Sequence, residues 1–446
     1  MPTTALSSSP KKKKTMQRLS APAARFAFTI LLLINILNYV DRYILSAVLP
    51  QLQTDFHLDN TQLGLLSSSF LLIYAIATLP LGIWADRGIR KNIVAFCVGV
   101  WSIFTTLTGF AQNFIQLFLM RSVLGIGEAG YAPAALSLIG DYFPPAQRGR
   151  VLSLWSIGNL IGTALGLILG GLIAQRFGWR WAFYIVGIPG LITAFLIWRT
   201  TEPERGAYDT QDNDASPVTT LHGSLNSNLR KTIAYLLHIP TYWILLVAFV
   251  FSFFTIGSAS VWVPTYLVDA FHLNVAQAGS VSGGVLAGGS LLGTLLGGWL
   301  ADALQKRTPR GRLIISTLAF LLGTPLALIA LLTHQLLPFI LMLALAIITL
   351  SLCLGPLNAV LQDIIAPEMR ATAIGITLLL AHLLGDASSP SIIGIIADRA
   401  PGGLGFALLI TAPPCLLIAG LVSLLGLSTV ERDMQAMQEH LKHSKG

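Results

Sequence analysis

Residues 82–91 have the sequence Gly-Ile-Trp-Ala-Asp-Arg-Gly-Ile-Arg-Lys, a short polar stretch that separates two blocks of apolar residues. A shorter version, Gly-Trp-Leu-Ala-Asp at 298–302, again separates two apolar blocks and is followed by Lys306 and Arg307. Blocks near 20 residues long can cross about 30 Å of hydrocarbon as helices. The two stretches therefore predict loops between membrane spans.

The same kind of apolar block recurs along the whole chain and predicts two sets of six spans. They lie near 25–49, 61–85, 92–112, 114–140, 150–174 and 181–198, and near 241–268, 276–302, 313–333, 335–361, 370–397 and 404–427. Only 11% of the residues are charged and 54% are hydrophobic, whereas about 25% charged is typical of soluble domains. We therefore predict an all-α membrane protein with 12 transmembrane helices.

The formal net charge of +8 comes from short basic clusters between the apolar blocks, unlike the single basic face of a nucleic-acid-binding protein. With a cytoplasmic N-terminus, all but five of the 28 Lys and Arg residues fall on the cytoplasmic side. Arg176, Arg180 and Arg399 fall in outside loops, and Arg42 and Arg121 fall in the interior of spans. Arg25, Arg150 and Arg370 begin spans at their cytoplasmic ends and are counted with that side. The positive-inside rule thus predicts cytoplasmic termini, in a plasma membrane or a bacterial inner membrane, and no nucleic-acid partner.

The two sets of six spans share sequence in register. The stretch at 56–64 recurs at 271–279, with Phe-His-Leu, Gln and Gly in the same places. Asp141, Pro145 and Arg148 recur as Asp363, Pro367 and Arg370, and 171–176 returns as 394–399. We therefore predict two pseudo-symmetric six-helix bundles. In this architecture the substrate binds near the midplane between the halves, and rocking of one half against the other gives alternating access.

The repeat and the polar stretches divide the chain into five predicted regions. These are a cytoplasmic basic tail (1–24), an N-terminal six-helix bundle (25–198), a cytoplasmic linker (199–240), a C-terminal six-helix bundle (241–427) and a cytoplasmic tail (428–446). The linker is rich in Ser, Thr and Asn and mixed in charge, which is typical of a loop between domains.

The sequence contains none of the patterns that a membrane enzyme or a metalloprotein would need. No HExxH, GxSxG or phosphate-loop motif is present, and Cys97, Cys353 and Cys415 lie inside apolar blocks without metal-ligand spacing. We therefore expect no enzymatic activity, no catalytic residues, no metal and no cofactor. The sequence leaves open a non-transporting sensor built on a carrier scaffold.

The two loop stretches resemble the loop signature of the major facilitator superfamily, and each stands in the corresponding place of its half. The resemblance implies that fold for nearly the whole chain, and it implies a cytoplasmic gate that these loops latch. The expected gate residues are Gly82, Asp86, Arg87, Arg90, Lys91 and Asp302. Positive-inside charge explains Arg90 and Lys91 as well, but it accounts poorly for the recurrence of Asp86 as Asp302.

Within the superfamily, two further motifs resemble the spinster family. One is Asn-Tyr-Val-Asp-Arg-Tyr-Ile-Leu at 38–45 in the first span, and the other is Arg-x-x-x-Gly-x-Gly-Glu-Ala at 121–129 in the fourth. Families that carry organic anions share part of both patterns. The resemblance to spinsters implies an amphipathic substrate, such as a lysophospholipid or a sphingoid phosphate.

Gly158, Gly162, Gly166 and Gly170 in the fifth span fall close to one stripe of a helix. They resemble the glycine-rich motif of antiporters, although Thr163 stands where that motif usually has proline. Tight packing against a neighbouring helix is the better explanation, because small residues let membrane helices approach closely.

Charged residues lie well inside two spans of the N-terminal half, Asp41 and Arg42 in the first and Arg121 and Glu128 in the fourth. A charge at the bilayer centre costs about 3 kcal/mol, so such residues usually face a cavity, pair with one another and mark a transport path. Arg121 and Glu128 lie two turns apart and share a helix face, whereas Asp41 and Arg42 point about 100° apart. At least one of the first-span residues can therefore face the fourth span.

We predict that Asp41 or Glu128 carries a coupling proton. A carboxylate in a dry cleft is harder to ionise, and a nearby guanidinium favours its charged form, so small changes in water access can load or release its proton. We expect Arg121 to compete for the carboxylate, and Arg42 or Arg121 to pair with an anionic group of the substrate. The matching residues of spinsters are implicated in the same way. A permanent structural salt bridge is the alternative.

His382 and Asp386 lie one turn apart in the eleventh span and form a candidate second proton relay. Histidine titrates near neutral pH, which suits that role. Packing between helices explains His382 equally well.

These observations predict a proton-coupled secondary active transporter that works by alternating access and is driven by a proton gradient. We expect a monomer whose partners are a lipid or small-molecule substrate and the surrounding membrane lipids. The alternative is a symporter of a hydrophilic organic anion, for which a second cationic residue in the other half would be expected. Apart from Arg370, the first residue of the eleventh span, no Lys or Arg falls within predicted spans seven to twelve.

Overall fold

A computed structural model describes residues 20–208 and 232–443, and within these ranges it contains helices and no strands. The N-terminal helices are α1 (Ala21–Phe56), α2 (Asn60–Arg87), α3 (Arg90–Thr108), α4 (Phe114–Ala129), α5 (Tyr131–Tyr142), α6 (Pro145–Phe177) and α7 (Trp179–Arg199). The C-terminal helices are α9 (Pro240–Phe271), α10 (Val275–Gln305), α11 (Gly311–Leu332), α12 (Leu336–Asp363), α13 (Arg370–Ala381), η1 (His382–Asp386), α14 (Ser389–Arg399), α15 (Gly403–Gly426) and α16 (Val430–His443). Most of the predicted basic tail and much of the predicted linker lie outside the described residues.

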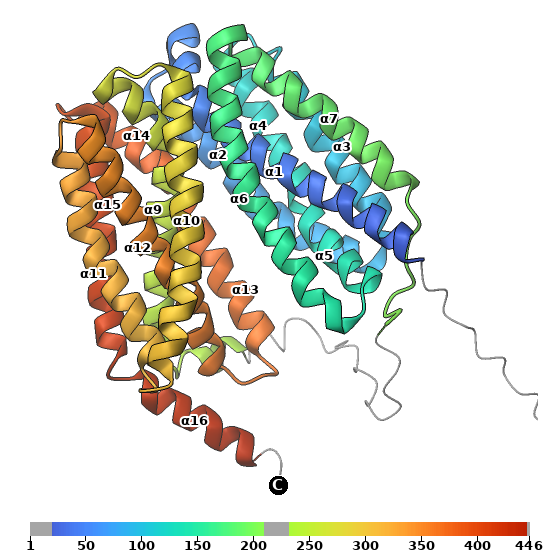
Figure 1. Ribbon diagram of the computed structural model, residues 1–446, viewed down its shortest axis with the longest axis vertical. Coiled ribbons are helices and arrows are strands. Elements are labelled where there is room, and N and C mark those ends of the chain that lie inside the picture. The colour runs from blue at the N-terminus through green and yellow to red at the C-terminus, as the bar shows by residue number, and fades with distance from the viewer. Residues whose placement is uncertain (1–19, 209–231, 444–446) are drawn as a thin grey trace, which may run out of the picture.

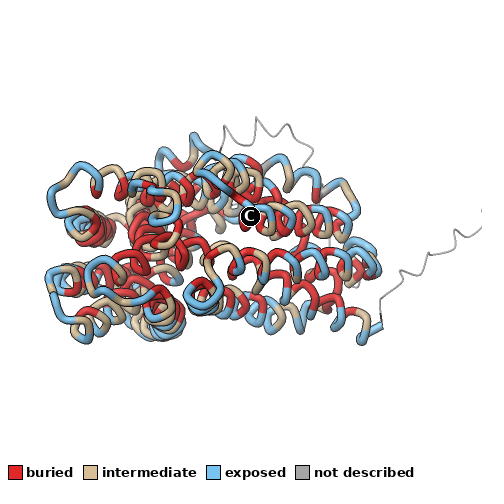
Figure 2. The backbone as a smooth tube through the Cα atoms, turned by 90° about the horizontal axis from the view of Figure 1, so that it is seen from above, coloured by how far each residue is buried: buried red, intermediate tan, exposed pale blue. Residues whose placement is uncertain are grey.

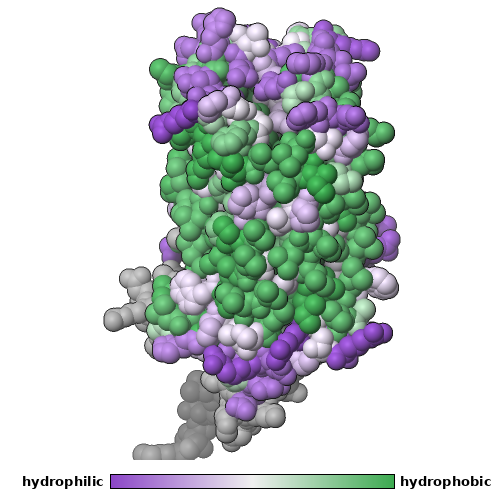
Figure 3. Space-filling view, turned by 90° about the vertical axis from the view of Figure 1, so that its left-hand side faces the viewer, coloured by the Kyte–Doolittle hydropathy of each residue, from purple (hydrophilic) through white to green (hydrophobic). Residues whose placement is uncertain are grey.

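Twelve helical segments of the described chain are long and apolar enough to cross a membrane, which confirms the predicted spans and the all-α fold class. Figure 1 shows two groups of helices side by side, α1 to α7 in one and α9 to α15 in the other, and Figure 2 shows buried residues on their inner faces. On the face that Figure 3 presents, an apolar belt lies between two polar ends. Such a belt is the surface expected where lipid is the solvent.

Two of the spans are not the continuous helices that the sequence predicted. The fourth span is interrupted at Gly130, between α4 and α5. In the eleventh span the five residues of η1 form a π-helix between α13 and α14. The first break lies beside the buried Glu128, and the second contains the partly buried Asp386. π-Helical turns are frequent at functional sites.

The repeated Phe-His-Leu sequence ends one helix and begins the next in both halves. His57 and His272 close α1 and α9 with a left-handed backbone, at φ of 52° and 55°. Asp59 and Asn274 then cap α2 and α10, each in a capping box with the Gln of its repeat. The internal repeat is therefore a repeat of local structure as well as of sequence.

The two bundles contact each other through α1 and α9, α2 and α14, and α6 and α10. We call the end of the molecule that carries the α2–α3 turn (88–89) the basic end, and the end that carries residues 57–59 the distal end. The closest approaches between the bundles, such as that of Gly64 to Pro390, lie toward the distal end. Figure 1 shows the ribbons of the two bundles spreading apart toward the basic end.

The glycine stripe of the fifth span packs against α1. A Cβ atom on Gly162 would lie 2.5 Å from Tyr39 Cβ and 2.6 Å from the Ile36 carbonyl oxygen, and one on Gly166 would lie 2.7 Å from the Val40 carbonyl oxygen. Side chains larger than hydrogen cannot fit at these distances. The stripe therefore positions the part of α1 that carries the two charged residues of the first span.

Candidate functional site

Asp41 on α1 is fully buried and faces Arg121 on α4. Its Oδ1 lies 3.6 Å from Nη1 of Arg121, and its Oδ2 accepts a hydrogen bond of 2.8 Å from Thr105 Oγ1 on α3. The Arg121 side chain is only 1% exposed. Three helices therefore converge on one carboxylate in the interior of the N-terminal bundle.

Arg42, the next residue on α1, pairs with Glu128, two turns along α4 from Arg121. Arg42 Nε donates to Glu128 Oε2 at 2.7 Å. The guanidinium also lies over the ring of Tyr74, 4.6 Å from its centroid, and within 5.4 Å of the Tyr39 ring. These aromatic faces stabilise a cation in a poorly hydrated place. Glu128 is 0% exposed and Arg42 is 21% exposed, so the guanidinium is the accessible member of the pair.

The two ion pairs cross between the same two helices and leave several polar atoms unpaired. Asp41 Oδ1, Glu128 Oε1, and Nε and Nη1 of Arg121 have no hydrogen-bond partner among the described residues. Unpaired buried polar groups are costly. A proton on either carboxylate, or an anion on a guanidinium, would change this balance, so the arrangement is suited to exchanging such charges.

The two arginines of these pairs line a cavity between the two bundles. Arg42, Arg121 and Asp386 all contribute to a space of ≈ 110 Å³. A second space of ≈ 240 Å³ shares Tyr39 and Ser260 with it. The cations come from the N-terminal bundle and the carboxylate from the C-terminal bundle, so this region lies where the predicted substrate path would run.

His382 and Asp386 form a pair within η1. His382 Nδ1 lies 2.9 Å from Asp386 Oδ2, and the His382 ring packs edge-on against Phe253 at 4.8 Å between centroids. The Asp386 side chain is 16% exposed and the His382 side chain 44%. The π-helix therefore brings the carboxylate of the predicted relay to the cavity, while the histidine also serves helix packing.

An apolar pocket inside the C-terminal bundle adjoins the space of ≈ 240 Å³ between the bundles. It shares Ala259, Ile347 and Leu350 with that space and continues between α9, α11, α12 and α15 to Tyr266 and Phe339. The N-terminal wall of the central region thus carries charge, and the C-terminal bundle offers an apolar extension.

The predicted gate residues of the first loop join a charge network within their own bundle. Arg90 is 2% exposed, pairs with Asp141, and donates through Nε to Glu202 Oε1 at 2.9 Å. Lys91 Nζ donates to the carbonyl oxygens of Trp198 and Thr200. These bonds tie the start of α3 to the end of α7.

Among the remaining predicted gate residues whose side chains the structure describes, none bridges the two bundles. Asp302 pairs with Arg312 of its own bundle at 3.3 Å, and Arg312 also pairs with Asp363 at 2.6 Å. Arg87 is exposed, and a Cβ atom on Gly82 would contact nothing within 4 Å. The side chain of Asp86 lies outside the described part of the structure.

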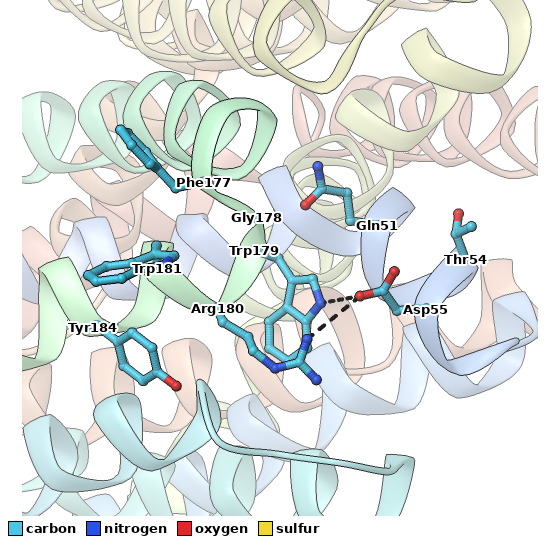
Figure 4. A pocket seen from close by; sticks show the side chains of 9 residues that line it. All are labelled: Gln51, Thr54, Asp55, Phe177, Gly178, Trp179, Arg180, Trp181 and Tyr184. Carbon is cyan, nitrogen blue, oxygen red and sulfur yellow. Dashed lines mark hydrogen bonds and ion pairs between the residues drawn. The ribbon is translucent and has the colours of Figure 1, made fainter.

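A separate hollow of ≈ 520 Å³ lies at the distal end of the N-terminal bundle (Figure 4). There Asp55 accepts a hydrogen bond of 2.7 Å from the Trp179 indole and lies 3.8 Å from Arg180 Nη1. Arg180 stacks over the Trp179 ring, 4.3 Å from its centroid. These contacts hold the end of α1 to the start of α7, away from the buried charges.

Sequence reasoning missed several partners of the predicted site residues. Thr105, which donates to Asp41, and Tyr74, which faces Arg42, carry no sequence signal that marks them. Arg312 could have been found, because it stands 222 residues after Arg90, the offset that relates Asp141 to Asp363.

Comparison with known proteins agrees with the geometry. The Major Facilitator Superfamily model matches residues 31–390. "Protein spinster homolog 1" of Xenopus tropicalis is 29% identical over 391 residues, covering 84% of this chain and 73% of that protein. An "MFS-type efflux pump" of Mycolicibacterium smegmatis is 30% identical over 380 residues, covering 85% of this chain and 86% of that protein.

Solved structures give the same result. The crystal structure of a bacterial homologue of the human lysosomal transporter Spinster, in an inward-facing and unoccupied conformation, matches with a TM-score of 0.78 and 26% identity. The match covers 94% of this chain and 99% of that one. These similarities confirm the predicted resemblance to the spinster family and the two-bundle fold.

Proposed function

This chain belongs to the Major Facilitator Superfamily, and on that premise we propose that it is a proton-coupled secondary active transporter of an amphipathic, lipid-like substrate. The family and the fold are those of transporters. The observation that carries the proposal is the crossed arrangement of Asp41 with Arg121 and of Arg42 with Glu128, whose two arginines line a cavity between the bundles.

The proposed coupling follows from the competition for each guanidinium. While both carboxylates are ionised, each cation has an internal anionic partner. A proton on Glu128 would remove the charge that holds Arg42, and the Arg42 guanidinium, 21% exposed, could then pair with an anionic group of the substrate. Loss of that proton would favour the internal pair again and release the substrate. Asp41 and Arg121 can act in the same way, and we propose His382 and Asp386 as a second relay.

The proposed cycle uses the proton gradient and no cofactor. We propose that the basic end faces the cytoplasm of a plasma membrane or bacterial inner membrane, because the positive-inside rule favours this orientation. With this orientation, the conformation that is closed at the distal end would give the substrate access to the site from the cytoplasm. A single chain contains both halves of the site, which supports a monomer as the working unit.

The apolar pocket supports an amphipathic substrate over a hydrophilic one. A polar head could meet Arg42 and Arg121, and an aliphatic chain could enter the C-terminal bundle past Ala259 and Ile347. A hydrophilic organic anion would favour a second cation on the opposite wall. Among the described residues that line the two central spaces, the C-terminal bundle contributes Asp386 and no Lys or Arg.

Uptake by purified protein in liposomes under an imposed pH gradient tests the substrate class. We expect gradient-dependent movement of labelled lysophospholipids or sphingoid phosphates, and none of a panel of small hydrophilic organic anions. Movement of the hydrophilic anions alone would overturn the lipid-like substrate and favour an organic-anion symporter. If neither the lipids nor the hydrophilic anions moved, the result would contradict proton-coupled transport of either class.

Ala259 lines both the space of ≈ 240 Å³ between the bundles and the apolar pocket, so Ala259→Phe should obstruct the junction between them. Because filling a packed space costs about 1–3 kcal/mol, we expect uptake of long-chain lysophospholipids to fall about tenfold or more. Short-chain analogues should lose less. Leu341→Phe, on an exposed apolar position of α12, is the matched control. Equal uptake of all chain lengths by the Ala259 variant and the control would contradict a tail in this pocket.

A further inference from the structure

A carboxylate at the distal end of α14 caps a helix of the other bundle. Asp398 Oδ1 accepts hydrogen bonds from Asn60 N at 3.0 Å and from Asn60 Nδ2 at 2.8 Å. Its Oδ2 accepts from Thr61 N at 2.7 Å and from Thr61 Oγ1 at 2.6 Å. One side chain of the C-terminal bundle therefore receives four hydrogen bonds from the N-terminal bundle.

These bonds complete the first turn of α2. The first N–H groups of a helix have no partner within the helix, and negative charge near them is stabilising. Asp59, the residue before α2, accepts from Gln62 N at 2.7 Å. Asp398 accepts from the two preceding N–H groups, those of Asn60 and Thr61. If the bundles separated at this point, the N–H groups of Asn60 and Thr61 would lose this acceptor and would be hydrated instead.

The cap lies on a close seam between α2 and α14. A Cβ atom on Gly394 would lie 2.3 Å from the Asn60 carbonyl oxygen, and one on Gly64 would lie 2.3 Å from the Pro390 carbonyl oxygen. The two helix backbones are thus in direct contact beneath Asp398. Asp398, Gly64 and Gly394 therefore all contribute to the same contact surface between α2 and α14.

The internal repeat produces a second seam of the same construction between α6 and α10. A Cβ atom on Gly171 would lie 2.5 Å from the Val275 carbonyl oxygen, and one on Gly279 would lie 2.4 Å from the Leu167 carbonyl oxygen. Gly171 matches Gly394, and Gly279 matches Gly64, in the repeats of the sequence. The distal end is therefore closed by two pseudo-symmetric seams.

The two seams differ in polarity. The position that matches Asp398 on α6 is Gln175, which is exposed and uncharged. The positions that match Asn60 and Thr61 on α10 are Val275 and Ala276, whose side chains cannot donate hydrogen bonds. A carboxylate cap of this kind is therefore specific to the α2–α14 seam.

We propose that Asp398 is the positioning residue that holds the distal end closed, and that release of its bonds to Asn60 and Thr61 is the step that opens the α2–α14 seam. This inference rests on the alternating access of the proposed function. The α6–α10 seam has glycine contacts without the carboxylate and separates or slides without an equivalent polar exchange. Asp398 acts on the closure equilibrium and has no contact with the central charges.

Spin-label distances test this inference without any substrate. Labels on Thr54→Cys and Ala270→Cys would report the separation of α1 and α9 at the distal end, at exposed positions away from Asp398. Because the cap comprises charge-assisted bonds in partly exposed surroundings, Asp398→Ala should raise the open fraction about three- to tenfold. Asp398→Asn, which removes the charge but keeps one acceptor oxygen, should produce a smaller rise. Gln175→Ala is the matched control and should leave the distances unchanged.

An unchanged distance distribution in both Asp398 variants would overturn the inference, as would an equal opening in Gln175→Ala. These outcomes are distinct from failure of the proposed function. Opening of the distal end in Asp398→Ala together with an absence of proton-driven lipid uptake in the unmodified protein would support the latch and refute the proposed transport. Proton-driven lipid uptake in the unmodified protein, together with unchanged distances in the Asp398 variants, would support the proposed transport and refute the role of Asp398.

Discussion

Glu128→Gln and Asp41→Asn should each lower gradient-driven uptake about 100-fold or more, the scale on which a positioned proton-transfer group contributes. Each substitution keeps the shape of the side chain and an acceptor oxygen for the neighbouring guanidinium, but neither amide can take up and release a proton at physiological pH. The initial rate of uptake into proteoliposomes, with and without an inward pH gradient, measures the effect.

Glu431→Gln provides a matched control for this prediction. Glu431 also pairs with an arginine, since Arg310 Nη2 lies 2.7 Å from its Oε2, but this pair lies at the basic end and both side chains are partly exposed. Loss of the Glu431 charge should leave gradient-driven uptake close to that of the unmodified protein. Full gradient dependence in both Glu128→Gln and Asp41→Asn would contradict coupling through these carboxylates.

Arg42→Ala should destabilise the protein strongly. It leaves Glu128, a fully buried carboxylate, without its 2.7 Å partner, and breaking a buried pair from one side costs about 3–5 kcal/mol. For a chain of 446 residues we expect the midpoint of thermal unfolding in detergent to fall by about 3–5 °C. The double variant Arg42→Ala/Glu128→Gln should recover most of this loss, because no unpaired charge remains. It should not recover transport.

The exposed pair of Arg310 and Glu431 again provides the comparison. Its side chains are 43% and 35% exposed, and ion pairs in such surroundings contribute about 0–1 kcal/mol. Arg310→Ala should therefore change the thermal midpoint little. If Arg42→Ala were as stable as Arg310→Ala, the Arg42–Glu128 pair would not be a desolvated charge pair, and the competition for Arg42 would lose its basis.

The spans were predictable because lipid imposes a length and a composition that few other structures share. The repeat added the division into two bundles, since register between halves survives in turns such as 56–64 and 271–279. The breaks in the fourth and eleventh spans were not predictable. The interruption at Gly130 and the π-helix at His382–Asp386 depend on packing against neighbouring helices, for example of Gly385 against Phe253.

The four buried charges could be identified from sequence because charge inside an apolar block is costly. Their pairing could not, since adjacent residues on α1 point in different directions and the choice depends on how α1 sits against α4. The contacts of Gly162 and Gly166 place α1 against α6 and so contribute to that arrangement. For the gate, the sequence supplied Arg90 but missed Glu202, which reaches Arg90 from the region after α7.

We propose that protons move with the substrate through the site of the crossed ion pairs. A pH-sensitive dye enclosed in proteoliposomes, read while a lysophospholipid is added outside, measures this directly. We expect a pH change inside the liposomes that follows substrate movement in the unmodified protein and is lost in Glu128→Gln and Asp41→Asn. Substrate movement without any pH change in the unmodified protein, or an undiminished pH change in both variants, would contradict this proposal.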